Sequence, residues 1–324
     1  MTRAVTRTVT GVATRPRRTR LVDAVTYALY AAGWRLVRLL PEGLAYRLFE
    51  VVADVAWRRR GTGVRRLEAN LARVRPGLDA AGLRTLSRAG MRSYLRYWCD
   101  SFRLPDWSHE RIRSTVRVEG DEPVREALAS GRGVVMFLGH LGNWDHAGAW
   151  STLSLAPVTT VAERLRPERL FDRFVRFRER LGMTIIPLTG GSDVFRTLLR
   201  TLRDGGFVPL LADRDLTQGG VEVQLFGEPA RMAVGPAALA LQTGAALFAV
   251  GIFYERRSSG GHGIVVRWAP PVDTTDVGSG RPAVTALTQR CADHLAEVIA
   301  AHPEDWHMLQ KVFVADLDPA RRPA

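Results

Sequence analysis

Apolar runs without polar alternation recur from residue 133 onward in this 324-residue chain, and helical stretches separate them. The clearest are GVVMFL (Gly133–Leu138), FVPLLAD (Phe207–Asp213) and ALFAVGIFY (Ala246–Tyr254). Strands that are buried on both faces have such continuous apolar sequences, and the helices between them supply the crossovers of a parallel sheet. We therefore predict an α/β fold in which a mostly parallel central sheet is flanked by helices on both faces.

The same pattern divides the chain into four parts. Residues 1–20 contain six arginines and no acidic residue, and we expect them to form a disordered basic tail. Residues 21–115 are predicted to be an N-terminal helical segment packed on the core, residues 116–315 the α/β core, and residues 316–324 a C-terminal tail. Breaks at Pro41, RRRGTG and RPG delimit three candidate helices in the helical segment: VTYALYAAGWRLVRLL, GLAYRLFEVVADVAW and a run that contains LRTLSRAGMRSYLRYWCDSF.

One uncharged stretch, from Met232 to Tyr254, is long enough to suggest a membrane span. We interpret it instead as a helix that begins near Pro236 and ends before Gly244, followed by a separate buried strand. The apolar stretch Leu21–Leu40 is interrupted by charged residues and is predicted to be an amphipathic helix that can lie on a membrane. The sequence therefore predicts no transmembrane span.

Charge and cysteine content limit the classes of partner. The chain carries 46 Lys or Arg residues against 33 Asp or Glu, a net charge of +13. Such a surface attracts nucleic acids, anionic lipids or phosphorylated ligands, but the chain has no recognisable nucleic-acid motif. Cys99 and Cys291 belong to no Cys/His cluster, which predicts neither a zinc site nor a disulfide framework and favours a reducing cytoplasm.

The stretch GHLGNWDHAGAW (Gly139–Trp150) places polar residues directly after the predicted strand GVVMFL. Four residues separate His140 from Asp145. A helix that begins near Gly142 or Asn143 would put the Asp145 carboxylate in its first turn, within reach of one imidazole nitrogen. The other nitrogen could then act as a general base toward an alcohol. We also predict that the backbone N–H groups of Gly142 and Asn143 stabilise the resulting oxyanion.

Motifs of other enzyme classes are missing from the sequence. The chain has no G-x-G-x-x-G after a strand, no P-loop, no H-E-x-x-H and no G-x-S-x-G, which disfavours dinucleotide oxidoreductases, P-loop kinases, zinc proteases and serine hydrolases. No Ser or Cys stands beside His140 as a nucleophile, so we expect no covalent enzyme intermediate. No metal or cofactor is expected.

A second polar cluster, ADRD (Ala212–Asp215), follows the predicted strand FVPLL. Ligands of parallel sheets bind at the carboxyl ends of the strands, so this cluster and His140 are predicted to converge on one site. The sequence leaves open whether Asp213 or Asp215 faces that site. Arg214 could pair with either acid.

The extended motif GHLGNWD resembles that of the bacterial lipid A (lauroyl/myristoyl) acyltransferases, and the resemblance covers roughly residues 21–315. Four further blocks carry the resemblance: AERLRPERLFDRFVRFRERLGM (162–183), PLLADRDL (209–216), VEVQLFGEPARMAVGPAALALQTGA (221–245) and EDWHMLQKVFVADL (304–317). The last two blocks, together with ADRDL, look most like the actinobacterial branch of that family, which acylates phosphatidylinositol mannosides.

The resemblance implies a role for each matching residue. His140 would be the base that deprotonates the acceptor hydroxyl, Asp145 would orient it, and Asp213 would be an acid that completes the site. A second group is implied to bind substrate, although a solvated helix face or an ordinary turn would equally explain several members: Glu163, Arg178, Arg214, Asp215, Gly227 and Arg231. Arg178 in particular would pair with a phosphate of the donor or acceptor.

We therefore expect a peripheral enzyme at the cytoplasmic face of the plasma membrane, bound to an anionic membrane surface. It would move a fatty acyl group, palmitoyl by expectation, from acyl-CoA to a mannose hydroxyl of a phosphatidylinositol mannoside. The alternatives are an acyltransferase for another glycolipid or lysophospholipid, lipid A included, and a non-catalytic lipid-binding or nucleic-acid-binding protein. The sequence leaves open whether the donor is CoA or an acyl carrier protein.

Overall fold

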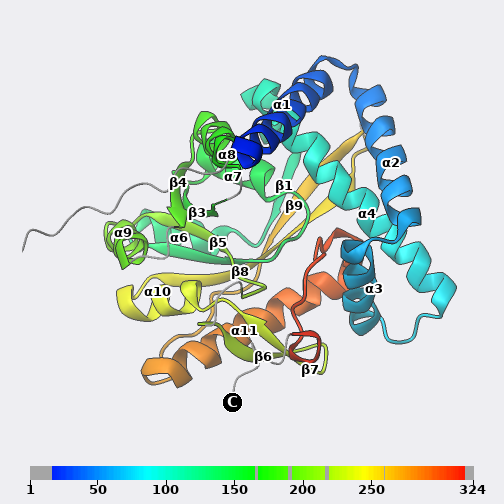
Figure 1. The fold of residues 1–324 in the computed structure, drawn as a ribbon. Coiled ribbons are helices and arrows are strands. Elements are labelled where there is room, and N and C mark those ends of the chain that lie inside the picture. The colour runs from blue at the N-terminus through cyan, green and yellow to red at the C-terminus, as the bar shows by residue number, and fades with distance from the viewer. Residues whose placement is uncertain (1–16, 165–166, 189–191, 216–218, 259, 318–324) are drawn as a thin grey trace, which may run out of the picture.

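Helices make up the N-terminal part of the chain, as predicted (Figure 1). The computed structural model describes residues 17–164, 167–188, 192–215, 219–258 and 260–317. Its first helices are α1 (Arg17–Leu39), α2 (Glu42–Arg59), α3 (Thr62–Val74), α4 (Ala80–Arg103) and α5 (His109–Ser114).

The boundary of the basic tail differs from the prediction. Helix α1 already begins at Arg17, so residues 17–20 are helical and not part of a disordered tail. Residues 1–16 of the predicted basic tail and residues 318–324 of the predicted C-terminal tail lie outside the described residues.

Helix α3 is an element that the sequence analysis missed. The predicted break at RRRGTG is present, since α2 ends at Arg59, but a further helix begins at Thr62. Val64, Leu67, Leu71 and Val74 are buried on one face of this helix, and their spacing of three or four residues is typical of an amphipathic helix. The arginines that alternate with them hid this pattern.

The central sheet has five strands in the order β1-β9-β8-β2-β5. They are β1 (Val116–Glu119), β2 (Val134–Leu138), β5 (Phe207–Leu211), β8 (Ala246–Arg256) and β9 (His262–Trp268). Strands β8 and β9 are antiparallel, and the other neighbouring pairs are parallel. The prediction of a mostly parallel sheet is therefore confirmed.

Helices cover both faces of this sheet, as Figure 1 shows. Val135 and Phe137 of β2 point into a core shared with α9, α10 and α11. Val134, Met136 and Leu138 point to the opposite face, into a core shared with α4, α6, α7 and α8. The core helices are α6 (Glu122–Ala129), α7 (Trp144–Ser154), α8 (Glu168–Arg180), α9 (Ser192–Arg203), α10 (Gly235–Thr243) and α11 (Gly280–Ala301).

A second parallel pair, β3 (Thr159–Glu163) and β4 (Thr184–Leu188), lies beside the edge strand β5. Val158 still forms a bridge with Phe207 of β5. Two residues further along the chain, a side chain makes the contact with β5: Thr160 Oγ1 donates to the carbonyl oxygen of Pro209 at 2.6 Å. Pro209 lacks the N–H that a ladder needs, which fits its place on an edge strand. Residues of both β3 and β5 line the cavity described below.

The stretch VEVQLFG (221–227) contains the first strand of a hairpin. It forms β6 (Val221–Leu225), and the chain returns as an antiparallel strand β7 (Glu228–Met232). Phe226 and Gly227 form the turn with φ of 52° and 79°, the left-handed backbone that two-residue hairpins favour. The turn that would explain Gly227 is therefore present, but it leads into strand β7 before the next helix, because the charged sequence EPARM conceals a strand.

The uncharged stretch Met232–Tyr254 is divided between elements as predicted. Helix α10 has Pro236 in its first turn and ends at Gly244, whose φ is 71°, and β8 begins at Ala246. Among the described residues, no helix is both long enough and apolar enough to cross a bilayer.

Candidate active site

His140 and Asp213 meet at the carboxyl ends of the neighbouring parallel strands β2 and β5. Leu138 and Leu211, the last residues of these strands, are in register. His140 Nδ1 lies 2.6 Å from Asp213 Oδ1, and the backbone N–H of His140 donates to Asp213 Oδ2 at 2.8 Å. The two polar clusters converge as predicted. Of the two acids that the sequence left open, Asp213 is the one that faces the histidine.

The environment of Asp213 keeps its carboxylate ionised. The residue is fully buried, and the indole Nε1 of Trp306 donates to Oδ2 at 3.0 Å. Burial would raise the pKa of Asp213, but the charge of His140 and the hydrogen bonds from His140 and Trp306 outweigh it and lower the pKa. An ionised carboxylate on Nδ1 favours a proton there, which leaves Nε2 of His140 as the nitrogen that can act as a base.

Asp145 does not orient His140, contrary to the prediction. Its carboxylate is bound by Arg178 of α8, whose Nε lies 2.6 Å from Oδ1, and by Tyr97 of α4, whose hydroxyl donates to Oδ2 at 2.8 Å. The Asp145 side chain leaves the first turn of α7 on the side that faces α4 and α8. Those helices supply partners that are 48 and 33 residues away in sequence, so the spacing to His140 gave no sign of them.

The Asp145 cluster is a buried ion pair with a neutral donor. Burial would lower the pKa of Arg178, but the charge of Asp145 outweighs it and holds the pKa above its ordinary value. Burial, together with the charge of Asp145, raises the pKa of Tyr97, so its phenol stays neutral. Arg178 was predicted to bind a phosphate, but its Nε and Nη2 both contact Asp145.

Gly142 is not available as an oxyanion donor, which corrects the second prediction for this loop. Its backbone N–H donates to the carbonyl oxygen of Asp305 at 3.0 Å. The residue has φ +52°, and a Cβ at this position would lie 2.6 Å from the carbonyl oxygen of Ile252. The glycine is thus required for close packing of the loop against β8 rather than for substrate approach.

Asn143 has a capping role instead of the predicted oxyanion role. It is the N-cap of α7, fully buried, and its Oδ1 accepts the backbone N–H of His146 at 2.9 Å. Of the described residues in this loop, His140, Trp144 and Asp145 line the cavity, and Gly142 and Asn143 do not. His140 and the first turn of α7 therefore face a ligand, whereas Gly142 and Asn143 do not.

The substrate-binding candidates separate into two groups. Glu163, Arg178, Arg214 and Asp215 line the cavity. Arg214 lies 3.8 Å from Glu163 rather than pairing with Asp213 or Asp215. Arg231 lies behind this group, with Nη2 3.3 Å from Asp215 Oδ2 and 3.1 Å from the carbonyl oxygen of Gly220.

Two of the predicted substrate contacts are not at the cavity. Arg231 is buried in β7, and Gly227 occupies the turn of the β6–β7 hairpin. Neither is among the described residues that line the cavity. The structure therefore does not bring Arg231 or Gly227 to the cavity beside His140.

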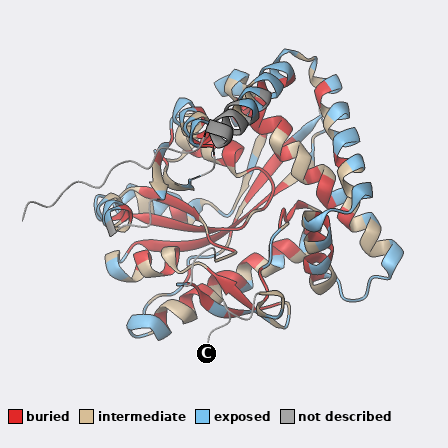
Figure 2. Ribbon diagram, viewed as in Figure 1, coloured by how far each residue is buried: buried red, intermediate tan, exposed pale blue. Residues whose placement is uncertain are grey.

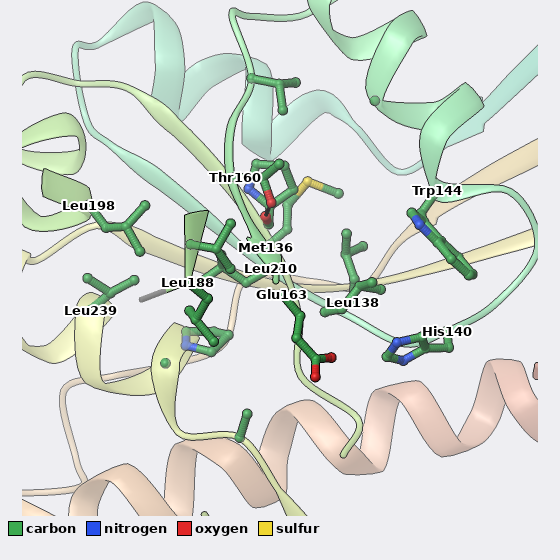
Figure 3. Close-up of a pocket in the computed structure, with 18 of the residues that line it drawn as sticks. Met136, Leu138, His140, Trp144, Thr160, Glu163, Leu188, Leu198, Leu210 and Leu239 are labelled. Atoms are coloured by element: carbon green, nitrogen blue, oxygen red, sulfur yellow. Dashed lines mark hydrogen bonds between the residues drawn. The ribbon is translucent and has the colours of Figure 1, made fainter. Parts of the chain in front are cut away.

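The cavity has a volume of about 530 Å³. Figure 3 shows His140 and Trp144 at one end and Leu198 and Leu239 at the other. Most of the described residues that line it are apolar; they include Met136, Leu138, Val158, Met183, Leu188, Val194, Phe195, Leu198, Leu210, Leu211 and Leu239. The arrangement can hold a long apolar group with its polar end beside the histidine.

Comparison with known proteins identifies the family. The model of the bacterial lipid A biosynthesis acyltransferases matches residues 15–314. The chain belongs to this family. It is 47% identical over 301 residues to a Mycolicibacterium smegmatis protein named phosphatidylinositol mannoside acyltransferase. The aligned residues cover 92% of this chain and 94% of that relative. Proteins of the same name from two Mycobacterium tuberculosis strains are 47% identical over 296 residues, 90% of each chain.

The predicted family is therefore confirmed, and the protein is an acyltransferase. The family match includes the C-terminal block EDWHMLQ, to which the sequence analysis assigned no chemical role. In the structure this block packs against the loop that carries His140. The backbone N–H of His307 donates to the carbonyl oxygen of His140 at 2.8 Å, and Trp306 and Leu141 form a bridge.

Trp306 and Tyr97, which contact the two carboxylates, were not predicted because they lie far from the GHLGNWD motif in sequence. Trp306 binds Asp213, and Tyr97 binds Asp145. His307 is buried beside Ser93, with Nε2 2.8 Å from the hydroxyl oxygen, and burial together with the charge of His140 lowers the pKa of His307 to about 3. The only sequence signal for these roles was the block resemblance at the C-terminus.

Proposed function

We propose that this acyltransferase moves a fatty acyl group, palmitoyl by expectation, from acyl-CoA to a mannose hydroxyl of a phosphatidylinositol mannoside. The observation that carries the proposal is the His140–Asp213 pair at the polar end of an apolar cavity. The choice of acceptor is supported by the names of the relatives, which are 47% identical over nine-tenths of the chain or more.

His140 is the proposed general base. With Nδ1–H held by Asp213, Nε2 accepts the proton of the acceptor hydroxyl as its oxygen attacks the thioester carbonyl carbon. The tetrahedral intermediate collapses when the C–S bond breaks, and the His140 imidazolium returns the proton to the CoA thiolate. The Asp213 carboxylate stabilises that imidazolium throughout. The acyl group passes directly from sulfur to oxygen, without an acyl-enzyme.

The first turn of α7 is the proposed source of oxyanion stabilisation. Trp144 and Asp145 begin this helix and line the cavity beside His140. Backbone N–H groups in a first helical turn have no intrahelical acceptor and carry the positive end of the helix dipole. They can therefore take the role that Gly142 and Asn143 cannot.

The apolar part of the cavity is the proposed acyl site. Each methylene that leaves water contributes about 0.8 kcal/mol, so a long chain gains most by filling the space between His140 and the leucines of α9 and α10. Glu163 and Arg214, which also line the cavity, are proposed to bind hydroxyl groups of the acceptor sugars. Shorter acyl donors are expected to bind more weakly in proportion to the methylenes they lack.

Attachment to the cytoplasmic face of the plasma membrane is part of the proposal. Figure 2 shows exposed residues along the outer sides of α1 and α2. Among the described residues, every exposed large apolar side chain except Leu78 and Leu188 belongs to these two helices: Val25, Tyr30, Leu36, Leu39, Leu44, Leu48, Val51, Val52 and Val55. Apolar side chains flanked by arginines are typical of helices that lie in the interface of an anionic bilayer.

The test is an acyl-transfer assay with palmitoyl-CoA and purified phosphatidylinositol mannoside, read by mass spectrometry of the lipid. Wild-type protein is expected to produce a lipid one palmitoyl group heavier, and His140→Ala to lose this product. Parallel reactions with palmitoyl carrier protein and with a lysophospholipid identify the donor and the acceptor. Transfer that survives His140→Ala would contradict the base, and transfer to the lysophospholipid alone would contradict the acceptor.

A further inference from the structure

A groove between α1 and α8 lies outside the catalytic cavity. Four charged side chains line it, three of them arginines: Arg35, Arg38, Arg173 and Asp106. The remaining wall is formed by small or apolar side chains of α1, Leu39 among them. The groove therefore carries an excess of positive charge on one side and apolar surface on the other.

The three arginines differ in how they are held. Arg38 is committed to Asp106, with its Nε 2.6 Å from Oδ2. Arg173 lies over the indole of Trp34, with its Cζ 4.9 Å from the ring centroid, a cation–π contact that fixes the guanidinium in place. In the described part of the chain, neither Arg35 nor Arg173 is ion-paired with a carboxylate. Their N–H donors are thus available to an anion from outside.

The groove runs beside the exposed apolar ridge of α1. Leu36 is 55% exposed and Leu39 is 74% exposed. Val25 lies 11 residues before Leu36 and 14 before Leu39, a spacing that keeps all three on one side of the helix. A ridge of this kind enters the acyl region of a bilayer, and the groove next to it would then lie at the depth of the lipid phosphates.

We infer that the groove between α1 and α8 binds the phosphate of a membrane phospholipid, with Arg35 and Arg173 as its donors. A guanidinium is suited to this ligand because its N–H groups contact two phosphate oxygens at once. The inference rests on the proposed peripheral attachment and adds a defined binding site to it. Diffuse attraction between charges would need no such site.

The site also gives the bound protein an orientation. Trp34 of α1 packs on Phe174 and Phe177 of α8, with ring centroids 5.3 Å and 5.5 Å away. The next residue of α8, Arg178, binds Asp145 at the cavity. A phosphate held by Arg35 and Arg173 would therefore bridge the anchoring helix and the helix that forms part of the cavity wall.

The experiment measures binding to phosphatidylcholine vesicles with and without 30% phosphatidylglycerol by co-sedimentation. The double variant Arg35→Gln/Arg173→Gln is expected to lose roughly 30-fold in affinity for the anionic vesicles, because a phosphate bound in the groove loses the charge-assisted hydrogen bonds of both guanidinium groups. The matched control is Arg47→Gln/Arg58→Gln on α2. It removes two exposed arginines that flank the apolar side chains of the neighbouring helix, and we expect it to cost at most a few-fold.

Each outcome has one meaning. Equal losses for the two pairs would overturn the phosphate site but leave the membrane attachment standing. Failure of wild-type protein to bind either vesicle would overturn the attachment itself. Inorganic phosphate, added at constant ionic strength, is expected to leave vesicle binding unchanged. Phosphate binding that needs Arg35 and Arg173, together with unchanged vesicle binding by Arg35→Gln/Arg173→Gln, would assign the groove to a soluble phosphate and overturn the lipid assignment.

Discussion

Two buried carboxylates flank the cavity, and their surroundings differ in kind. Asp213 follows β5 and receives donors from the imidazole and backbone of His140 and from Trp306. Asp145 lies in the first turn of α7 and receives donors from Arg178 and Tyr97. Asp213 thus faces an imidazole, whereas Asp145 faces a permanent cation and a neutral phenol.

Because of this difference, we expect the two acids to have different roles, although Asp145 is closer to His140 in sequence. A carboxylate on an imidazole fixes its tautomer and stabilises the imidazolium that forms during proton transfer. A carboxylate on a buried guanidinium neutralises a charge that would otherwise be costly. We therefore expect loss of Asp213 to affect mainly the chemical step, and loss of Asp145 to affect mainly stability.

The largest effect is expected for Asp213→Asn. An amide removes the charge that stabilises the imidazolium and no longer favours a proton on Nδ1, so kcat should fall roughly 1000-fold. The thermal midpoint should change little, because the amide keeps the shape of the side chain. Steady-state kinetics of acyl transfer measure the first quantity and calorimetry the second. A loss of less than tenfold in kcat would break the comparison.

A smaller effect on catalysis and a larger one on stability are expected for Asp145→Asn. The change leaves the guanidinium of Arg178 buried without a counter-charge, which costs about 3 kcal/mol of unfolding free energy. Activity at low temperature should fall only about tenfold. Urea unfolding of the single variant and of Asp145→Asn/Arg178→Met provides the check, since removal of both charges should recover most of the lost stability. A double variant no more stable than the single one would contradict the ion-pair account.

Trp306→Phe should affect catalysis more weakly. It removes one of the three hydrogen-bond donors that hold the Asp213 carboxylate against the His140 imidazole. Because the two side chains are then less well aligned, a fivefold loss in kcat, roughly 1 kcal/mol, is expected. With one donor fewer, the carboxylate becomes more basic and the His140 imidazolium more stable, so the acid limb of the kcat/KM profile should move to higher pH.

Trp268→Phe is the matched control for that change. Trp268 is also buried, and its indole nitrogen has no hydrogen-bond partner among the described residues. The control therefore removes the same atoms without removing a hydrogen bond. An unshifted profile in Trp306→Phe, or an equal shift in Trp268→Phe, would contradict a positioning role for Trp306.

His146, the second histidine of the stretch GHLGNWDHAGAW, is expected to affect the pH dependence of stability rather than activity. His146 is buried, with Nε2 3.1 Å from the hydroxyl oxygen of Thr115, and burial lowers its pKa to about 4. The unfolded chain takes up this proton near pH 6.5, before the folded protein does. Stability is thus lost as the pH falls from about 6.5 to about 4, by up to about 3 kcal/mol.

The variant His146→Phe should lack this loss. Its urea-unfolding free energy is expected to fall by about 3 kcal/mol less than that of the wild type between pH 6.5 and pH 4, whatever the offset between the two proteins at pH 6.5. Parallel pH dependences for the two proteins would show that His146 titrates normally and is not held neutral by burial.

The sequence predicted the parts of the molecule that depend on local pattern. The strands VVMFL and FVPLL, the division of Met232–Tyr254 into helix and strand, and the convergence of His140 with the ADRD cluster all follow from apolar periodicity and from the geometry of parallel sheets. Strand β7 was missed because Glu228 and Arg231 interrupt its apolar pattern, and α3 because arginines obscure its apolar face.

The partner of His140 could not be predicted in the same way. Asp213 is 73 residues away in sequence and Trp306 is a further 93, and only the strand order brings them together. A spacing of four residues placed Asp145 near the histidine on paper, but the direction of its side chain is set by Tyr97 and Arg178. Side-chain direction at the start of a helix depends on what packs against it, which a local pattern does not contain.

The most direct test of the central claim is the tautomer of His140, measured by two-dimensional ¹H–¹⁵N NMR of protein with labelled histidine at pH 7.5. The signal is assigned by its absence in His140→Gln. We predict a proton on Nδ1 in the wild type, its retention in Asp145→Asn and its loss in Asp213→Asn. Retention in Asp213→Asn together with loss in Asp145→Asn would contradict the account and return the orienting role to Asp145.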